Sequence, residues 1–171
     1  MNIDRFLPPL DKAVDSFTAQ IKHEMERRAY LAANEMRNAS QLVLRGTRSG
    51  RVYKVPGTHG KRLSKATKAM LPDYGKKLRG GRLYRASAPG EAPANRLGTF
   101  RESWQASSHV VYGSYISRIE SDVKTEDGKY NLGEILENGT DDGRIQPRPF
   151  EEPIMERAKP KILRIYNQPY F

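Results

Sequence analysis

Cysteine is absent from this chain of 171 residues, which excludes a disulfide framework and thiolate metal sites and agrees with assembly in a reducing cytoplasm. Long apolar runs are missing as well, because no stretch approaches the roughly 20 apolar residues that span a bilayer. Residues 1–10 contain Asp4, Arg5 and two prolines where a signal peptide would have its apolar region. We therefore expect a soluble, unsecreted protein with no membrane partner.

Histidine occurs three times, and few acid–base, nucleophilic or metal-binding groups have an informative spacing. His23 and Glu24 lack the second histidine of the zinc-protease helix motif. Residues 57–61 resemble a phosphate-binding loop, but only two residues separate the glycines, and Arg62 stands where Ser or Thr is needed. We therefore expect a protein that is not an enzyme and that has no cofactor or metal ion.

Acidic residues are nearly missing from one stretch of the chain. Residues 45–85 contain 13 lysines or arginines and one acid, Asp73, a local charge of +12 in a chain of net charge +10. Such an excess attracts phosphate backbones with little sequence preference. A solvated loop is the other interpretation, because lysine-rich loops are common and few aromatic residues, Tyr74 and Tyr84 among them, are present for base stacking. Both interpretations remain open.

Glycine and proline are missing from residues 11–45, where apolar residues recur at steps of three or four. This spacing predicts a long helix over residues 10–45 that stops at Gly46. Two shorter helices bent near residues 34–40 are the alternative. A rod of about 50 Å is longer than a small core covers, so we expect part of its apolar face to pack against a neighbouring subunit.

Glycines and prolines interrupt the middle of the chain repeatedly. Residues 51–55 and 82–87 each alternate basic or polar residues with Val, Tyr or Leu, which predicts two short strands that pair as a hairpin. The basic piece between them would project, with one or two helical turns over residues 63–71. Further along the chain, residues 110–123 are predicted to form two strands, or one bent strand, around Gly113.

Three shorter helices are predicted in the second half of the chain. Thr99 should cap a helix over residues 100–105, whose two aromatic side chains should lie in the core. A helix over residues 130–138 should end at the glycine that follows it. An amphipathic helix should span residues 150–165, with a kink or an early end at Pro160.

Two separated stretches carry recognisable motifs. Residues 85–93 read RASAPGEAP and are followed by LGTFRESW at 97–104, whereas residues 130–140 end in LENGT and precede RPF at 148–150. They resemble, in the same order, the Ser-Ala-Pro-Gly-Glu-Pro-Pro connector, the Gly-x-Leu-x-x-Ser helix start, the Tyr-Ala-x-x-x-Glu-x-Gly-Thr motif and the Arg-Pro-Phe motif of the small neck proteins of tailed phages. Members of this family are described as head–tail joining, tail-completion or minor structural components of siphophage-type virions. The motif residues here are Ser87, Pro89, Gly90, Tyr130, Glu137, Gly139, Thr140, Arg148, Pro149 and Phe150. The chain departs from the pattern in a long basic insert, 55–80, and a lengthened turn, 121–128.

The second motif also has a physical interpretation that is independent of the family. Gly139 would take a left-handed conformation that closes the short helix, and Thr140 would bond its hydroxyl back to the turn. The prolines on either side of Arg148 would hold the chain extended, and Phe150 would anchor the last helix in the core. These roles are structural, and we expect the surface that they shape to make the subunit contact.

The resemblance implies a single α+β domain in which a long N-terminal helix and a C-terminal helix pack on a small antiparallel sheet, with a long basic loop insertion. The regions of this domain would be the long helix (10–45), the basic hairpin and insertion (46–98), and the sheet with the C-terminal helix (99–171).

The resemblance also implies a homo-oligomeric ring in the virion neck, assembled in the host cytoplasm, with a hexamer favoured and a dodecamer as the alternative. Its partners would be adjoining neck, portal-side and tail-terminator rings, together with non-specific contact to genomic DNA in the channel. The basic residues expected to face DNA or an acidic partner ring are Lys61, Arg62, Lys65, Lys68, Lys76, Lys77 and Arg79. The alternative function is a free-standing basic nucleic-acid-binding protein, which the isoelectric point of about 9.9 supports.

Overall fold

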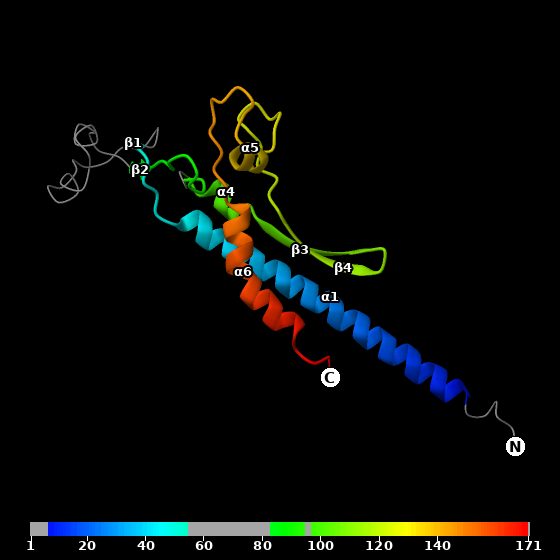
Figure 1. Ribbon diagram of the computed structural model, residues 1–171. Helices are drawn as coiled ribbons and strands as arrows, with labels where there is room; N and C mark the ends of the chain where they lie inside the picture. Colours follow the sequence, from blue (N-terminus) through cyan, green and yellow to red (C-terminus); the bar gives the residue numbers. More distant parts are fainter. Residues whose placement is uncertain (1–6, 55–82, 95–96, 171) are drawn as a thin grey trace, which may run out of the picture.

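The computed structural model describes residues 7–54, 83–94 and 97–170, and Figure 1 shows their arrangement. In chain order the elements are α1 (Leu7–Arg45), β1 (Val52–Lys54), β2 (Leu83–Arg85), α4 (Thr99–Glu102), β3 (Gln105–Val111), β4 (Ser114–Glu120), α5 (Leu132–Asn138) and α6 (Glu151–Tyr166). The basic insert, with the helical turns predicted over residues 63–71, lies outside the described residues. None of the described helices is long and apolar enough to cross a bilayer.

Helix α1 is one continuous helix of 39 residues, about 58 Å long at 1.5 Å per residue. The predicted long helix is therefore confirmed and the alternative of two shorter helices is wrong, because no glycine or proline interrupts the helix after its first turn. Pro8 and Pro9 lie in that first turn, where a backbone N–H has no partner within the helix. The N-terminal half of α1 extends beyond the other described elements (Figure 1).

The core lies between the C-terminal half of α1, helix α6 and the β3–β4 sheet (Figure 1). Helix α1 contributes small residues, with Ala32 and Ala33 fully buried, so that the facing elements can approach its backbone closely. Helix α6 contributes Ile154 and Ala158, which lie four residues apart on one face and are both buried. This packing of two long helices with small antiparallel sheets confirms the predicted α+β fold class.

Three aromatic rings pack against one another within this core. Phe150 is fully buried, and the ring centroids of Phe100 and Trp104 lie 5.7 Å and 5.8 Å from its own in edge-on contacts. Such geometry is favourable for aromatic rings because the positive edge of one meets the negative face of another. The predictions that Phe100 and Trp104 lie in the core and that Phe150 anchors the last helix are confirmed.

Two antiparallel strand pairs complete the fold. Strands β1 and β2 pair with Tyr53 opposite Tyr84, as the alternation of residue types predicted, although both strands are shorter than expected. Strands β3 and β4 pair around a turn at Gly113, so two strands form here and the single bent strand does not. The first of them begins at Gln105, not at residue 110. Pairing with β4 extends it, because Ala106 lies opposite Ile119 and both pack against the core.

The short helix α4 differs from the expectation at both ends. Gly98, with a φ of 98°, is its N-cap residue, and no side chain caps the helix, so the prediction that Thr99 is the cap is wrong. Instead, the backbone N–H of Glu102 donates to the carbonyl of Gly98 over 2.9 Å. The helix ends at Glu102 because the chain turns at once into β3.

Helices α5 and α6 follow the predictions more closely. Helix α5 begins at Leu132, where the side chain of Asn131 accepts a hydrogen bond from the N–H of Gly133 at 2.8 Å and caps the first turn. Helix α6 continues past Pro160 to Tyr166, so the predicted early end is wrong.

Arg28 of α1 holds the segment that follows α6. Its side chain is 1% exposed, and its guanidinium donates to the carbonyls of Gln168 at 2.7 Å and Pro169 at 2.6 Å. The same group lies 4.0 Å from the ring centroid of Tyr170 and forms an ion pair with Glu24 at 2.8 Å. The positive charge is therefore fully partnered, and it fixes the end of the described chain on α1.

Candidate functional site

The two sequence motifs meet at Arg148. Its Nη1 lies 2.8 Å from the hydroxyl of Ser87 and 2.7 Å from the carbonyl of Ala88, and it also contacts the carbonyl of Ser87. The carbonyl of Pro147 accepts a hydrogen bond from the N–H of Gly90 at 3.2 Å, and the N–H of Arg148 donates to the carbonyl of Leu136 at 2.7 Å. We call the contact between residues 87–93, residues 147–150 and α5 the motif junction. Hydrogen bonds to a charged donor are stronger than those between neutral groups, so the junction is held firmly.

Pro89 and Gly90 shape the first motif as a tight turn. The N–H of Glu91 donates to the carbonyl of Ala88 at 3.1 Å, and Gly90 has a φ of +79°. Proline followed by glycine suits the two central positions of a type II turn, because the second position requires a positive φ. The turn directs the carbonyls of residues 87 and 88 toward Arg148.

The carboxylate of Glu91 joins this turn to the chain that follows α1. It accepts hydrogen bonds from the backbone N–H of Ser49 at 3.0 Å and from that of Ala88 at 2.8 Å. Hydrogen bonds that the Ser49 side chain and then the Ser49 backbone N–H donate to the carboxylate lower the pKa of Glu91 to about 2, and the Ala88 N–H and the nearby charge of Arg48 act in the same direction. The ionised form is therefore the one that joins the turn to the chain after α1.

Glu137 caps helix α6. Its carboxylate accepts from the backbone N–H of Phe150 at 2.8 Å and from that of Glu151 at 3.3 Å. These donors lie at the start of the helix, where N–H groups have no partner within the helix and the helix dipole favours a negative charge. Glu137 thus links the last turn of α5 to the first turn of α6.

Gly139 and Thr140 form the turn that leaves α5. Gly139 has a φ of 79° and a ψ of −168°, so the predicted left-handed helical conformation is wrong in ψ, although the positive φ still favours glycine. A Cβ added there would lie 2.6 Å from the carbonyl oxygen of Ile145. The hydroxyl of Thr140 accepts from the N–H of Ile145 at 3.0 Å and donates to Asp142 at 2.7 Å, which confirms that it bonds back to the turn. The Thr140 hydroxyl and the Arg144 backbone lower the pKa of Asp142.

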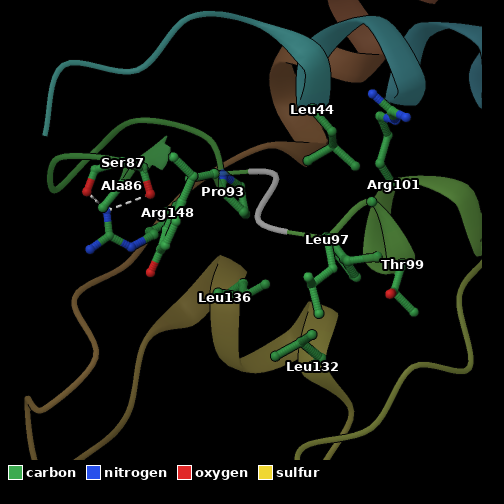
Figure 2. A pocket seen from close by; sticks show the side chains of 14 residues that line it. Leu44, Ala86, Ser87, Pro93, Leu97, Thr99, Arg101, Leu132, Leu136 and Arg148 are labelled. Atoms are coloured by element: carbon green, nitrogen blue, oxygen red, sulfur yellow. Dashed lines mark hydrogen bonds between the residues drawn. The ribbon is translucent and has the colours of Figure 1, made fainter. Parts of the chain in front are cut away.

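A cavity of about 440 Å³ lies beside the motif junction. In Figure 2 the side chains of Leu44 and Leu132 lie on opposite sides of it. The described part of its wall is mainly apolar, and Arg101 and Arg148 are the charged residues in that part. Its lining residues are Leu44, Tyr84, Ala86, Ser87, Pro93, Ala94, Leu97, Gly98, Thr99, Phe100, Arg101, Leu132, Leu136 and Arg148. Such a wall suits an apolar or aromatic group with one polar atom, and none of the described residues that line it is a carboxylate or a histidine.

The described part of the chain contains no cluster of three or more His, Asp or Glu that could hold a metal ion. The polar groups of the motif junction bond mostly to backbone groups, and they hold segments in place rather than face a substrate. The arrangement is that of a scaffold with an adjoining apolar cavity.

The structure brings together most of the motif residues but not all of them. Nine of the ten lie in the motif junction or in the turns and helix ends that form it. Tyr130 lies apart with 60% of its surface exposed, and its carbonyl accepts from the N–H of Thr125 at 3.0 Å. The basic residues at positions 61, 62, 65, 68, 76, 77 and 79 lie outside the described residues, so their expected contacts with DNA or a partner ring stay predictions.

Two exposed apolar surfaces add to this picture. One is the N-terminal half of α1, where Leu10 and Val14 are 59% and 54% exposed. The spacing of apolar residues along this helix had predicted an apolar face that a small core would not cover. The other is the turn between β3 and β4 with its fully exposed Tyr112, which the sequence analysis missed. The signal that could have found it is the absence of charged residues over residues 105–117.

The fold and the motif junction define an α+β protein whose described part has a scaffold, a cavity and exposed apolar surfaces as its prominent features. Comparison with known proteins adds no relative, since no protein family, curated protein or solved structure matched the chain.

Proposed function

We propose that this protein is a structural subunit of the neck of a tailed phage, where copies form a ring that joins head to tail around the DNA channel. The observation that carries the proposal is the meeting of the two motifs at Arg148 and Ser87. The residues of the two motifs lie far apart in the chain. In the structure they act together and hold the connector, α5 and α6 in a fixed arrangement. A subunit of a ring needs such rigidity because each contact surface must keep its angle to the next.

The exposed apolar residues support assembly. Leu10 and Val14 lie on the part of α1 that extends beyond the other described elements, and apolar side chains gathered on such an extension are typical of protein–protein contact. The expectation that α1 packs against a neighbouring subunit is part of this proposal. A hexamer is the favoured copy number, with adjoining neck, portal-side and tail-terminator rings as partners.

The basic stretch over residues 45–85 supports a place beside DNA. Its local charge of +12 would attract phosphates without reading sequence, as a channel that passes the whole genome requires. Replacing Lys61, Arg62, Lys65, Lys68, Lys76, Lys77 and Arg79 by Gln should reduce the slope of DNA affinity against salt concentration. An unchanged slope would remove DNA from the proposal.

The same basic stretch also favours a second candidate, a free-standing nucleic-acid-binding protein. Such a protein would bind nucleic acid tightly as a monomer or dimer and would need no ring. The neck proposal expects weak, non-specific binding and assembly with adjoining rings. Sedimentation of the protein with and without duplex DNA separates these outcomes.

The decisive experiment is deletion of the gene from the phage genome that carries it, followed by electron microscopy of the lysate. We expect filled heads and complete tails that are not joined, and joining restored when the protein is supplied from a plasmid. Normal virions in the deletion lysate would contradict the proposal. Neighbouring portal, capsid and tail-tube genes would agree with it, and a ribosomal operon would not.

A further inference from the structure

The turn between β3 and β4 presents a large aromatic side chain to solvent. Tyr112 is fully exposed, and it is the one non-glycine residue with a positive φ, 48°, in the described ranges. Gly113 beside it has a φ of 78°, so this is a two-residue turn with two positive φ angles, for which Asn-Gly or Asp-Gly is the favoured pair. A bulky residue in this conformation is strained. Folding of this chain alone gives no reason for a tyrosine here.

The residues around Tyr112 are apolar and uncharged. Val110, Val111 and Ile116 are 59%, 42% and 44% exposed, and residues 105–117 contain no charged side chain in a sequence that is 29% charged. Two copies of a protein with net charge +10 repel one another. This repulsion is weakest for a contact made through a surface without charged side chains. The absence of lysine and arginine also makes this surface unsuited to phosphate. We call Val110, Val111, Tyr112 and Ile116 the hairpin tip.

The cavity beside the motif junction has the matching properties. Its described wall is mainly apolar, and Arg101 and Arg148 have N–H groups that can donate a hydrogen bond to a phenol oxygen. Figure 1 shows the turn between β3 and β4 pointing away from α4 and α5, which contribute residues to the cavity wall. The tip therefore cannot fill the cavity of its own subunit.

We infer that the hairpin tip of one copy docks in this cavity of the next copy, with Tyr112 inserted between α4 and α5. This inference rests on the proposed ring and identifies its subunit contact. The contact joins two different surfaces, so it is head-to-tail, and its repetition closes a ring when the rotation from one copy to the next divides a full turn. An aromatic anchor that enters a mainly apolar pocket and keeps one hydrogen bond is typical of the residues that dominate binding energy. Each subunit in a closed ring makes the contact twice, which compensates for its small area.

The absence of cysteine allows a direct test by disulfide crosslinking. The full chain with Thr99→Cys and Tyr112→Cys should form a ladder of covalent oligomers beyond the dimer when it is oxidised, and the ladder should disappear on reduction. Thr99 is an exposed residue at the cavity wall. The matched control carries Asp141→Cys with Tyr112→Cys, because residue 141 is exposed and does not line the cavity. A ladder no stronger than that of the control overturns the inference, as does equal dimer formation by Tyr112→Cys alone, which would indicate contact between two tips.

A second variant separates association from folding. Tyr112→Asn removes the aromatic anchor and introduces the residue that the turn favours. We expect sedimentation velocity to shift toward smaller species while the thermal midpoint rises or stays the same. Tyr130→Asn removes another exposed tyrosine and should leave association unchanged. Association of Tyr112→Asn equal to that of the original protein contradicts the inference.

The outcomes distinguish this inference from the proposed function. Unjoined heads and tails on gene deletion, together with no crosslinked ladder, leave the neck function in place and remove only this contact. A ladder together with normal virions on deletion leaves the contact in place and removes the neck function.

Discussion

The guanidinium of Arg148 lies 2.8 Å from the hydroxyl of Ser87, 61 positions earlier in the chain. This contact joins the segment that leads into α6 to the connector that follows β2, and the same nitrogen also contacts the carbonyl of Ala88. Two short motifs that are separate in sequence are therefore parts of one structural unit. The stability of that unit can be measured.

Replacing Arg148 by Ala should lower the free energy of unfolding by about 2–3 kcal/mol, because a charged donor is lost and the acceptors that it served are left partly buried without a partner. Urea denaturation measures the change. Arg144→Ala is the control, since the Arg144 side chain is 86% exposed, and it should change the free energy of unfolding by less than about 0.5 kcal/mol. Equal effects of the two substitutions would mean that the junction contributes nothing to stability.

Phe150→Ala should lower the free energy of unfolding by about 3–5 kcal/mol, because the ring is fully buried against Phe100 and Trp104 and its removal leaves a cavity. Phe150→Leu should cost less, since most of the volume remains. Thermal or urea denaturation distinguishes the two. A Phe150→Ala variant as stable as the original protein would contradict the position of Phe150 in the core.

Gly139→Ala should destabilise the protein more than Gly143→Ala. Both glycines have a positive φ, 79° and 68°, so each substitution carries a strain of about 1 kcal/mol. A Cβ at position 139 also meets the Ile145 carbonyl at 2.6 Å, whereas a Cβ at position 143 meets nothing within 4 Å. The difference between their unfolding free energies therefore combines the steric contact with the strain of the φ 79°, ψ −168° conformation at position 139, which is essentially restricted to glycine. No difference would show that the turn after α5 can relax.

Stability should depend on pH through Glu91. Its pKa is lowered from 4.5 to about 2 in the folded protein, so the unfolded chain binds the proton more tightly. The stability from ionised Glu91 is therefore fully present above about pH 4.5 and is lost as the pH falls toward 2. Glu91→Gln should be less stable than the original protein at neutral pH, and the difference between their thermal midpoints should shrink over this range. A difference that stays constant down to pH 2 would contradict the hydrogen bonds to Ser49 and Ala88.

Local patterns predicted the elements that local forces form. Helix α1 follows from apolar residues at steps of three and four without an interrupting glycine, and the end of α5 follows from Gly139, whose positive φ favours glycine. The start of β3 at Gln105 could not be predicted in this way. Its residues have little strand character of their own, and pairing with β4 and packing of Ala106 on the core decide their conformation.

The candidate site divides in the same manner. The motif residues were identified from their order in the sequence, but their roles were not, because Glu137 caps a helix that begins 14 residues later and Arg148 bonds to a connector 61 residues earlier. Such contacts depend on where the chain returns in space.

By itself, the sequence determined the composition, the long helix, the turns and the family-like motifs, since each depends on neighbouring residues. The tertiary structure alone decided that the two motifs meet at Arg148 and that Tyr112 is strained and fully exposed in a turn that points away from the helices lining an apolar cavity. Burial and long-range hydrogen bonds are properties of the packed chain, and a local sequence pattern cannot predict them.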